Sequence, residues 1–411
     1  MPEPTSTPTG PTIAIIGAGL TGLITAHALR QSSFSVTLYD ADASLAARPR
    51  DWPLLLHWAL PTLKSLLSPT AAARFDEAVC NRHIEYTPAI ESMPIINGVT
   101  GEVLFRPAAA PGARRVSRGR LRRVMAADFD GTEALQWGKA LVGLEAPEDG
   151  HGPVTMSFAD GTTATADYVL GADGAASKVR ELLFRGAEVA RVRPSGLMVA
   201  SALTRPGDEA KVREALRYHP MACVAMGTTA NCGVATMYVD DAEDMASWTL
   251  TWIKLWRKEK LPEAPATKGP EALAWVKETS GDLIEPFRGT IMGTRESEGC
   301  YVDEMRTWVP VEWDTRGGRV TLAGDAAHPM LVYRGQGYQH AVLDAQRFVE
   351  ALVSVREGRV GREEAIKAYT DDVVERGAKA VTQSLKEAEM SMDLESIKNS
   401  IMAKQGHGKA A

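Results

Sequence analysis

The chain has 411 residues, of which 45% are hydrophobic and 24% are charged, and its formal net charge at pH 7 is −6. This is the composition of a globular protein with two domains or one large domain. The acidic balance disfavours a nucleic-acid partner, because proteins that bind nucleic acids carry a basic surface. The four cysteines form no Cys-x-x-Cys pair, which disfavours a disulfide framework and a metal site and fits a reducing compartment.

The N-terminal segment, residues 1–11, is rich in Pro and Thr and lacks the basic-then-apolar pattern of a signal peptide. We therefore expect a disordered tail there. No apolar run approaches the length of a membrane span. We expect a cytoplasmic protein, and the sequence leaves open whether it is a monomer or a homodimer.

A dinucleotide-binding pattern begins at residue 12. Residues 12–16 (TIAII) predict a buried parallel strand, and the glycine-rich segment 17–22 (GAGLTG) follows at once. A helical stretch and a second strand, 36–39, come next, and that strand ends on Asp40. The order of strand, GxGxxG, helix, strand and acid is the whole pattern in its context, so we predict nucleotide binding. The pattern does not separate NAD from FAD.

Each residue of this pattern has a physical role. Gly17 permits the tight turn, Gly19 lets the backbone approach a pyrophosphate, and Gly22 lets the helix pack closely on the strand. Leu20 and Thr21 open the helix, whose unpaired N–H groups attract an anion. Asp40 is placed to accept a hydrogen bond from a ribose hydroxyl.

An apolar segment and an arginine-rich segment follow in residues 50–125. Trp52, Leu55, Leu56 and Leu60 have helix-like spacing, and His57 among them reads as structural. Six arginines crowd residues 114–123, either as a solvated basic face or with one arginine reaching a phosphate. We favour Arg118 for that contact, because it begins an Arg-x-x-Leu-x-x-x-Met pattern with its apolar residues on one helical face.

The middle of the chain reads as strands with one helix. Residues 154–158 and 164–170 flank an Ala-Asp-Gly turn and predict a hairpin, whose second strand runs into a polar cluster of Asp173, Gly174 and Arg180. Residues 181–300 contain short β-like runs and three tryptophans at a spacing of four. We expect Trp248, Trp252 and Trp256 on one helix face, either packed in a core or as an aromatic wall for a flat substrate.

The last third combines a strand, a carboxylate and a glycine-rich turn. Residues 320–323 predict a buried strand that Gly324-Asp325 breaks, and the turn of Gly335, Gln336 and Gly337 opens a helix. A carboxylate beside a free helix N-terminus suits a phosphate or a delocalised anion, although an ordinary strand–loop–helix crossover has the same pattern. Residues 362–395 are helical by composition.

The trio of motifs GAGLTG (17–22), LGADGAASKVR (170–180) and LAGDAAHPM with RGQG (322–337) resembles the single-component FAD-dependent monooxygenases of the p-hydroxybenzoate and salicylate hydroxylase type. The likeness is closest to fungal members of secondary metabolism. It implies a mixed α/β (α+β) fold, with a Rossmann-like FAD-binding domain, a discontinuous β-sheet substrate domain and a C-terminal helical arm. The implied FAD-binding domain comprises residues 12–80, 105–190 and 301–360. The implied substrate domain comprises residues 81–104 and 191–300, and the arm comprises residues 361–411.

The resemblance also assigns roles to single residues. Gly17, Gly19 and Gly22 would hold the FAD pyrophosphate, Asp40 the ribose and Arg118 the cofactor. Asp173 and Gly174, with Arg180 nearby, match an element linked to both FAD and the nicotinamide nucleotide. Gly324-Asp325 would bind the ribityl chain or its adjoining phosphate, and residues 335–337 would lie along the flavin ring.

The implied activity is monooxygenation of an aromatic or polycyclic natural product, with NADPH or NADH and O2 consumed through a flavin C4a-hydroperoxide. A base that takes the substrate's proton would help, and the candidates are Tyr218, His219, Tyr238, Tyr301 and His328. Departures from the family pattern occur at Val332, where many relatives carry a nearby proline, and at Gln339, where many have Asn. They keep two alternatives open: a flavin-containing dehydrogenase, and a non-redox cyclase or binding protein with FAD as a structural element.

Overall fold

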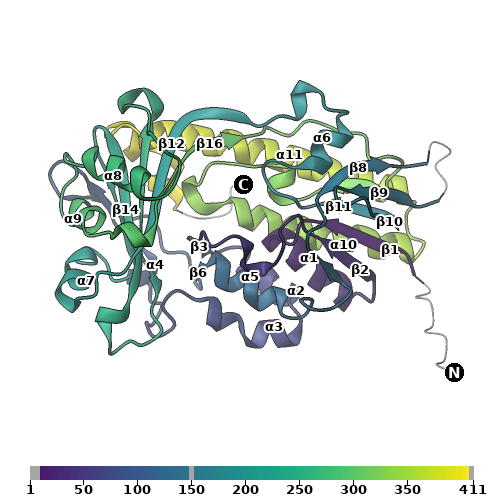
Figure 1. Ribbon diagram of the computed structural model, residues 1–411, viewed down its shortest axis with the longest axis horizontal. Helices are drawn as coiled ribbons and strands as arrows, with labels where there is room; N and C mark the ends of the chain where they lie inside the picture. The colour runs from purple at the N-terminus through teal and green to yellow at the C-terminus, as the bar shows by residue number, and fades with distance from the viewer. Residues whose placement is uncertain (1–9, 148–151, 407–411) are drawn as a thin grey trace.

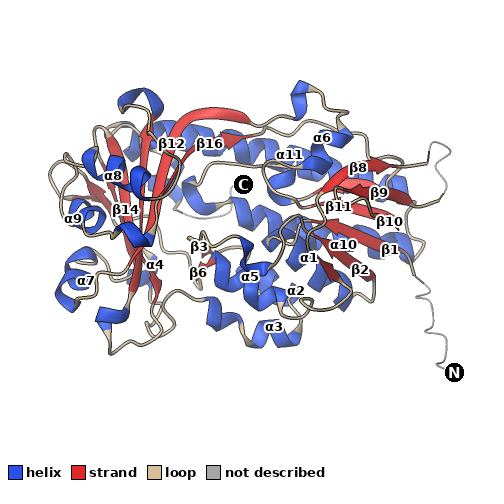
Figure 2. Ribbon diagram, in the orientation of Figure 1, coloured by secondary structure: helices blue, strands red, loops and turns tan. Residues whose placement is uncertain are grey.

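The computed structural model describes residues 10–147 and 152–406, so most of the expected N-terminal tail lies outside the described residues. A parallel sheet of five strands is built from three distant parts of the chain, in the order β17-β11-β1-β2-β7. Its strands are β1 (Thr12–Ile16), β2 (Ser35–Tyr39), β7 (Leu135–Gln136), β11 (Tyr168–Gly171) and β17 (Val320–Leu322). Figure 2 shows this sheet at one end of the molecule.

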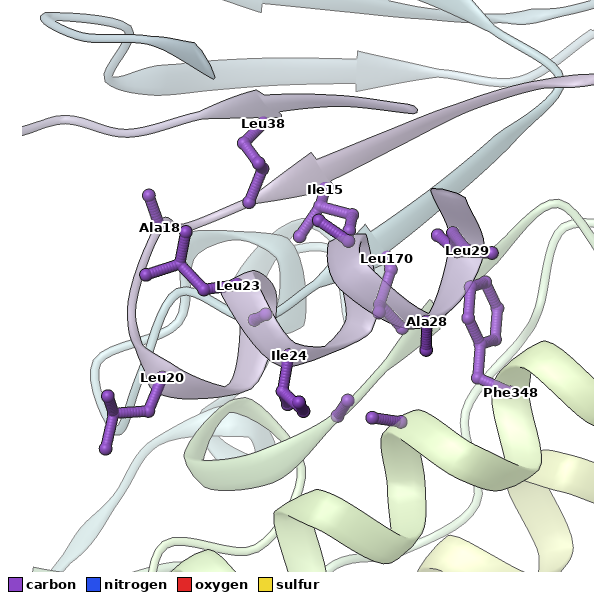
Figure 3. Close-up of a cluster of buried hydrophobic side chains, with 14 of the residues drawn as sticks. Ile15, Ala18, Leu20, Leu23, Ile24, Ala28, Leu29, Leu38, Leu170 and Phe348 are labelled. Carbon is purple, nitrogen blue, oxygen red and sulfur yellow. The ribbon is translucent and has the colours of Figure 1, made fainter. Parts of the chain in front are cut away.

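Helix α1 (Leu20–Gln31) packs on this sheet, and α10 (Gly337–Arg356) packs on α1. The contact is apolar: Leu23, Ile24 and Leu29 of α1 lie among buried side chains of β1, β2 and β11, with Phe348 of α10 beside them (Figure 3). Parallel strands buried on both faces read as continuous apolar runs, which is why residues 12–16 predicted β1 correctly.

A second, seven-stranded sheet has the order β16-β12-β15-β14-β13-β4-β5. Its strands are β4 (Ile95–Asn97), β5 (Val103–Phe105), β12 (Arg193–Thr204), β13 (Ala222–Met226), β14 (Ala230–Tyr238), β15 (Thr249–Arg257) and β16 (Tyr301–Thr307). Strand β16 pairs with β12, so residues 301–307 belong to the seven-stranded sheet. The sequence-based expectation placed these residues at the start of the last FAD-binding segment, 301–360.

The outer face of the seven-stranded sheet is covered by three helices (Figure 1). They are α7 (Glu209–Ala215), α8 (Pro270–Glu278) and α9 (Phe287–Met292). Trp252 and Trp256 are fully buried in this outer core, and Trp248 packs against it. The expectation of a helix at the tryptophans is wrong, because they lie in or beside strand β15, and a spacing of four also places side chains on one face of a strand. The structure supports core packing and not a substrate wall.

Smaller elements connect the two sheets. Strands β3 (Pro53–Leu56) and β6 (Arg114–Ser117) pair between them, so residues 53–56 form a strand where the spacing indicated a helix (Figure 1). Strands β8 (Leu141–Glu145), β9 (Val154–Phe158) and β10 (Thr163–Ala166) form a third sheet, which includes the expected hairpin. The second expected strand of that hairpin is divided at Asp167, whose Oδ2 accepts from the Thr12 backbone N–H at 2.7 Å, so that β11 joins the parallel sheet.

The remaining helices surround these sheets. They are α2 (Leu60–Leu66), α3 (Pro69–Ala73), α4 (Pro88–Glu91), α5 (Arg118–Ala126), α6 (Lys178–Leu183), α11 (Arg362–Ser391) and α12 (Ile401–Gln405). Helix α11 bridges the molecule: Tyr369 and Val373 pack in the core of the parallel sheet, and Leu385 and Ala388 pack against β12 and β15. None of the helices in the described ranges is long and apolar enough to cross a bilayer.

Candidate functional site

The three glycines of GAGLTG meet different surroundings. Gly17 has φ +107°, and a Cβ there would lie 2.5 Å from the carbonyl oxygen of Ala172. A Cβ on Gly22 would lie 1.9 Å from the carbonyl oxygen of Gly17. At Gly19, by contrast, no described atom lies within 4 Å of the Cβ position. Packing and backbone conformation therefore explain Gly17 and Gly22, whereas Gly19 borders free space at the start of α1.

The N-terminus of α1 faces that same space. Its N-cap is Gly19, which offers no side-chain oxygen to the first N–H groups, and the first turn carries no acidic residue. These N–H groups and the positive end of the helix dipole suit a pyrophosphate. The residues present therefore fit the dinucleotide that the sequence predicted.

Asp40 is tied to the glycine-rich turn. Its Oδ2 accepts from the Ala18 N–H at 2.6 Å, and its Oδ1 accepts from the Asp42 N–H at 2.8 Å. The Arg122 guanidinium lies 3.6 Å from the carboxylates of Asp40 and Asp42 and donates through Nε to the Ala18 carbonyl oxygen at 2.8 Å. Arg122 is a residue that the sequence reasoning missed. It lies four positions after Arg118 on α5, so the helical period could have pointed to it.

Arg118 lies at the start of α5, next to Trp52, whose ring centroid is 4.7 Å from the guanidinium carbon. Burial and the nearby Arg122 lower the pKa of Arg118, and the carboxylates of Asp325 and Asp51 oppose this shift. Asp325, which acts electrostatically on Arg118, follows β17 and lies more than 200 residues away in the sequence. The structure thus brings Arg118 and Asp325 into one electrostatic neighbourhood.

Asp325 is the exposed residue in an otherwise buried run, since residues 321–324 and 326–329 are all buried. Water reaches it, yet protein surrounds it on most sides, and this desolvation raises the pKa of its carboxyl group. His328, Arg118 and Arg180 oppose that rise. An accessible carboxylate held among three cationic or ionisable side chains is a suitable contact for a polar cofactor.

A buried ionic network fixes the loop that carries Asp325. Asp344 of α10 accepts from the Gly324 N–H at 2.7 Å, lies 2.8 Å from His328 Nε2 and accepts from Arg376 Nη2 at 2.6 Å. Burial would raise the pKa of Asp344, but His328, Arg376 and these hydrogen bonds outweigh it and hold the pKa well below its usual range. Gly324 itself has φ +59°, and a Cβ there would lie 2.4 Å from Thr21 Oγ1. Sequence reasoning gave no role to Asp344 or Arg376, because nothing local marks a pair that meets across two helices.

The cluster at Asp173 is built around the N-terminus of α6. Asp173 accepts from the N–H groups of Lys178 at 2.7 Å and Val179 at 3.1 Å, and burial raises the pKa of its carboxyl group. Gly174 has φ +81° and no described atom within 4 Å of its Cβ position. Arg180 is buried, and its guanidinium donates to the carbonyl oxygens of Ala175, Ala190 and Ala326. Arg180 therefore holds this loop against the Asp325 loop.

Hydrogen bonds join the glycine-rich turn and the first turn of α10 to β3 and to the β3–α2 connection. Gln339 is fully buried, donates to the Leu55 carbonyl oxygen at 2.7 Å and accepts from the N–H groups of His57 and Ala59 at 3.3 and 3.2 Å. Gln336 Oε1 accepts from Trp58 Nε1 at 2.9 Å. Gln339 at the position where many family members carry Asn thus has a structural reason, because its longer side chain reaches three backbone groups of the β3–α2 connection.

Four of the five candidate bases are engaged in ring packing, hydrogen bonds or an ion pair with neighbouring protein groups. Tyr218 stacks on Phe287 in the outer core, with ring centroids 6.3 Å apart. His219 Nδ1 accepts from two backbone N–H groups, and its Nε2 lies 3.2 Å from the Ala89 carbonyl oxygen. Tyr238 donates to Asp51 Oδ2 at 2.6 Å, desolvation raises its pKa, and His328 is paired with Asp344.

Tyr301 differs from the other four. It is half-buried at the start of β16, where it pairs with Ser201 of β12. The Arg50 guanidinium lies 4.7 Å from its ring centroid. Arg50 also lies 5.7 Å from the Trp52 ring, on which Arg118 packs. Tyr301 is therefore linked to Arg118 through Arg50 and Trp52, as Tyr238 is through Asp51.

Two family models match the chain: an FAD binding domain over residues 292–384 and an NAD(P)-binding Rossmann-like domain over residues 15–57. The FAD-dependent monooxygenase phnB of Penicillium herquei is 30% identical over 96% of this chain and 94% of its own. The FAD-dependent monooxygenase cctM of Talaromyces islandicus is 31% identical over 90% of each.

Solved structures agree in fold. HpxO of Klebsiella pneumoniae, complexed with FAD and uric acid, has a TM-score of 0.74 at 19% identity and covers 98% of this chain and 94% of its own. A salicylate hydroxylase substrate complex has a TM-score of 0.72 at 18% identity and covers 96% and 94%.

Proposed function

We propose that this chain, which belongs to the FAD-dependent monooxygenases, oxygenates an apolar aromatic compound with NADPH or NADH as the electron donor. The observation that carries the proposal is the convergence of three distant segments: the α1 N-terminus, Arg118 of α5 and Asp325 after β17. The flavin, when bound, supplies hydride acceptance and the activation of dioxygen. The protein's own part is to bind the cofactor, to orient the substrate and to exclude water.

For the cofactor, we assign the pyrophosphate to the N–H groups at Gly19, Leu20 and Thr21 and the ribose to Asp40. Arg118 is assigned to the phosphates and Asp325 to the ribityl chain. Gly335, Gln336 and Gly337 lie at the N-terminus of α10, where the helix dipole would stabilise negative charge on the flavin ring. Asp173 and Gly174 form a further contact, and we propose that Arg180 positions their loop instead of touching the cofactor.

For the substrate, we assign the inner face of the seven-stranded sheet. Val199, Val224 and Ile253 alternate with the buried outer-core residues along β12, β13 and β15, and each is only half-buried. Small aliphatic side chains on a rigid sheet suit a flat apolar ring and keep water away from it. Two relatives from fungi support a natural-product substrate. We extend the proposal to O2 as a substrate and to a cytoplasmic location.

An absorption experiment tests this proposal. The purified protein should show a flavin band in the visible range, and anaerobic NADPH should bleach it faster when an aromatic metabolite is present. Air should then restore the band with oxygenated product in a one-to-one ratio to NADPH. A reduced flavin that returns with a dehydrogenated and not oxygenated product would favour a dehydrogenase. A protein that binds no flavin after reconstitution would contradict the proposal as a whole.

A further inference from the structure

A small cavity of about 30 Å³ lies between the β3–β6 pair and the start of β13. Leu55 of β3 and Ala222 of β13 both line it. The Leu55 carbonyl oxygen accepts from Gln339, and its Cβ lies 4.0 Å from the position that a Cβ would take on Gly335. The cavity therefore adjoins the glycine-rich turn assigned to the flavin. Its volume has room for on the order of two water-sized groups, which is enough for a carboxylate and too little for a ring.

Arg115 of β6 brings a cation to this cavity. Its Nη2 lies 3.9 Å from the sulfur of Met93, and no carboxylate of the described residues forms an ion pair with it. Burial lowers the pKa of Arg115, although a guanidinium keeps its charge at neutral pH. Arg115 is half-buried, and a partly desolvated cation without an anionic partner is costly, unless a ligand supplies the partner.

Tyr86 brings a hydrogen-bond donor to the same cavity. Its hydroxyl oxygen is buried and faces the Arg115 backbone N–H, and no acceptor among the residues that the structure describes takes its O–H proton. Desolvation raises the pKa of Tyr86 to about 12, so the hydroxyl carries its proton at neutral pH. The Arg114 guanidinium lies 4.2 Å from the Tyr86 ring centroid and holds the ring in place.

The other polar lining groups are already engaged. Both His219 ring nitrogens contact backbone groups, as described above. Glu91 also lines the cavity, and its Oε1 accepts from the Gly112 N–H at 2.9 Å. The unsatisfied capacity therefore belongs to Arg115 and Tyr86, and both call for an acceptor, preferably one with negative charge.

The position of the cavity relates it to the substrate face. Ala222, which lines the cavity, and Val224 of the proposed substrate face are two residues apart on one side of β13. Two residues of a strand span about 7 Å, which is close to the distance across a substituted aromatic ring. A ring against Val224 could therefore place one substituent in the cavity.

We infer that this cavity is a subsite for one ionised oxygen substituent of the substrate, a carboxylate or a phenolate, with Arg115 as its counter-ion and Tyr86 as its hydrogen-bond donor. The inference rests on the proposed function. It assigns an acidic aromatic substrate and fixes which substituent of the ring lies in the cavity beside the glycine-rich turn.

Paired probes test the subsite in the FAD-loaded, full-length protein. Benzoate, salicylate and 2-naphthoate are each compared with the corresponding neutral amide, and binding is followed by the change in the visible spectrum of the flavin and by thermal shift. We expect at least one acid to bind at least tenfold more tightly than its amide. Arg115→Gln should abolish that preference and leave the affinity for the amide unchanged, and Tyr86→Phe should reduce the preference several-fold.

The control variant is Arg123→Gln, which removes the same charge from an exposed position on α5 and should leave the preference intact. If Arg115→Gln loses FAD, Arg115→Lys and Tyr86→Phe decide the role of the two side chains. Naphthols distinguish a phenolate ligand from a carboxylate, because their affinity should rise with pH through the phenol pKa while that of the acids stays constant.

Equal affinity for acid and amide throughout the panel and for the naphthols at high pH would overturn the subsite. So would a preference that survives Arg115→Gln. This failure is distinguishable from failure of the proposed function, because flavin binding and bleaching by NADPH would still be seen in the wild-type protein. Absence of both flavin binding and bleaching would instead contradict the proposed function.

Discussion

Replacement of Gly19 by Ala should separate cofactor binding from folding. Gly19 has φ −76° and ψ −176°, which alanine adopts without strain, and no described atom lies within 4 Å of the added methyl group. The stability of the FAD-free variant should therefore change by less than about 1 kcal/mol, because alanine reduces the entropy of the unfolded chain but is a poorer N-cap than glycine. FAD binding should weaken, because the methyl group would occupy space where the backbone approaches the pyrophosphate.

The expected loss of affinity follows from the cost of overpacking. One methylene-sized overlap costs about 1–3 kcal/mol, which raises the Kd for FAD by roughly 5- to 150-fold. Urea unfolding of the FAD-free protein measures the first effect, and titration of flavin fluorescence measures the second. Gly22→Ala is the matched comparison: its Cβ would overlap the Gly17 carbonyl oxygen, so the FAD-free protein itself should lose stability. The reasoning would be refuted by a Gly19→Ala protein that binds FAD like the wild type, or whose FAD-free form loses as much stability as that of Gly22→Ala.

Three further substitutions test the surrounding contacts. Asp325→Ala should lose FAD, and full FAD occupancy would contradict the assigned contact. Without FAD, the variant should be more stable than the wild type at pH 7, because burial raises the Asp325 pKa and the ionised carboxylate disfavours folding. This gain in stability should vanish below about pH 4, where the carboxyl group is protonated in the folded and the unfolded protein. Asp344→Asn should cost about 3–5 kcal/mol in urea unfolding at pH 7, since it leaves His328 without its anion and Arg376 with Asp372 alone. Because the Asp344 pKa is lowered, its contribution to the free energy of unfolding is present above the ordinary carboxyl pKa and is lost as the pH falls through the lowered value. The difference in stability between wild type and variant should therefore narrow below about pH 4. A difference that does not change with pH would count against the network. Gln339→Leu should lower the free energy of unfolding by about 1–3 kcal/mol and shift the visible spectrum of bound flavin, because three backbone groups lose their partner. An unchanged spectrum would show that the Gln339 hydrogen bonds do not shape the flavin turn.

Features encoded by neighbouring residues could be predicted from the sequence. The strand at 12–16, the turn at Gly17 and the helix after it depend on adjacent side chains and on backbone conformation. The helix opened by Gly337 and the long C-terminal helix were predicted for the same reason. The comparisons confirm the family and the use of FAD that the three motifs together indicated.

Features that depend on distant partners could not be predicted. The spacing of Trp248, Trp252 and Trp256 is compatible with a helix and with a strand, and only pairing with β12 and β14 decides between them. His219 resembled a base until its two ring nitrogens were seen to contact backbone groups. Among six arginines, Arg118 was expected to act alone, whereas Arg122 also lies at the glycine-rich turn.

The order of the strands in the parallel sheet has a consequence for biosynthesis. Strand β1 is among the first segments to leave the ribosome, but β17, which completes its sheet and carries Asp325, follows about 300 residues later. Strand β11 itself ends about 150 residues before β17, so at about 5–20 residues per second the edge of β11 stays unpaired for roughly 8–30 s. An exposed parallel edge invites pairing with other chains. A chaperone that covered this edge would protect it during that interval, and FAD can complete its site only after β17 has been synthesised.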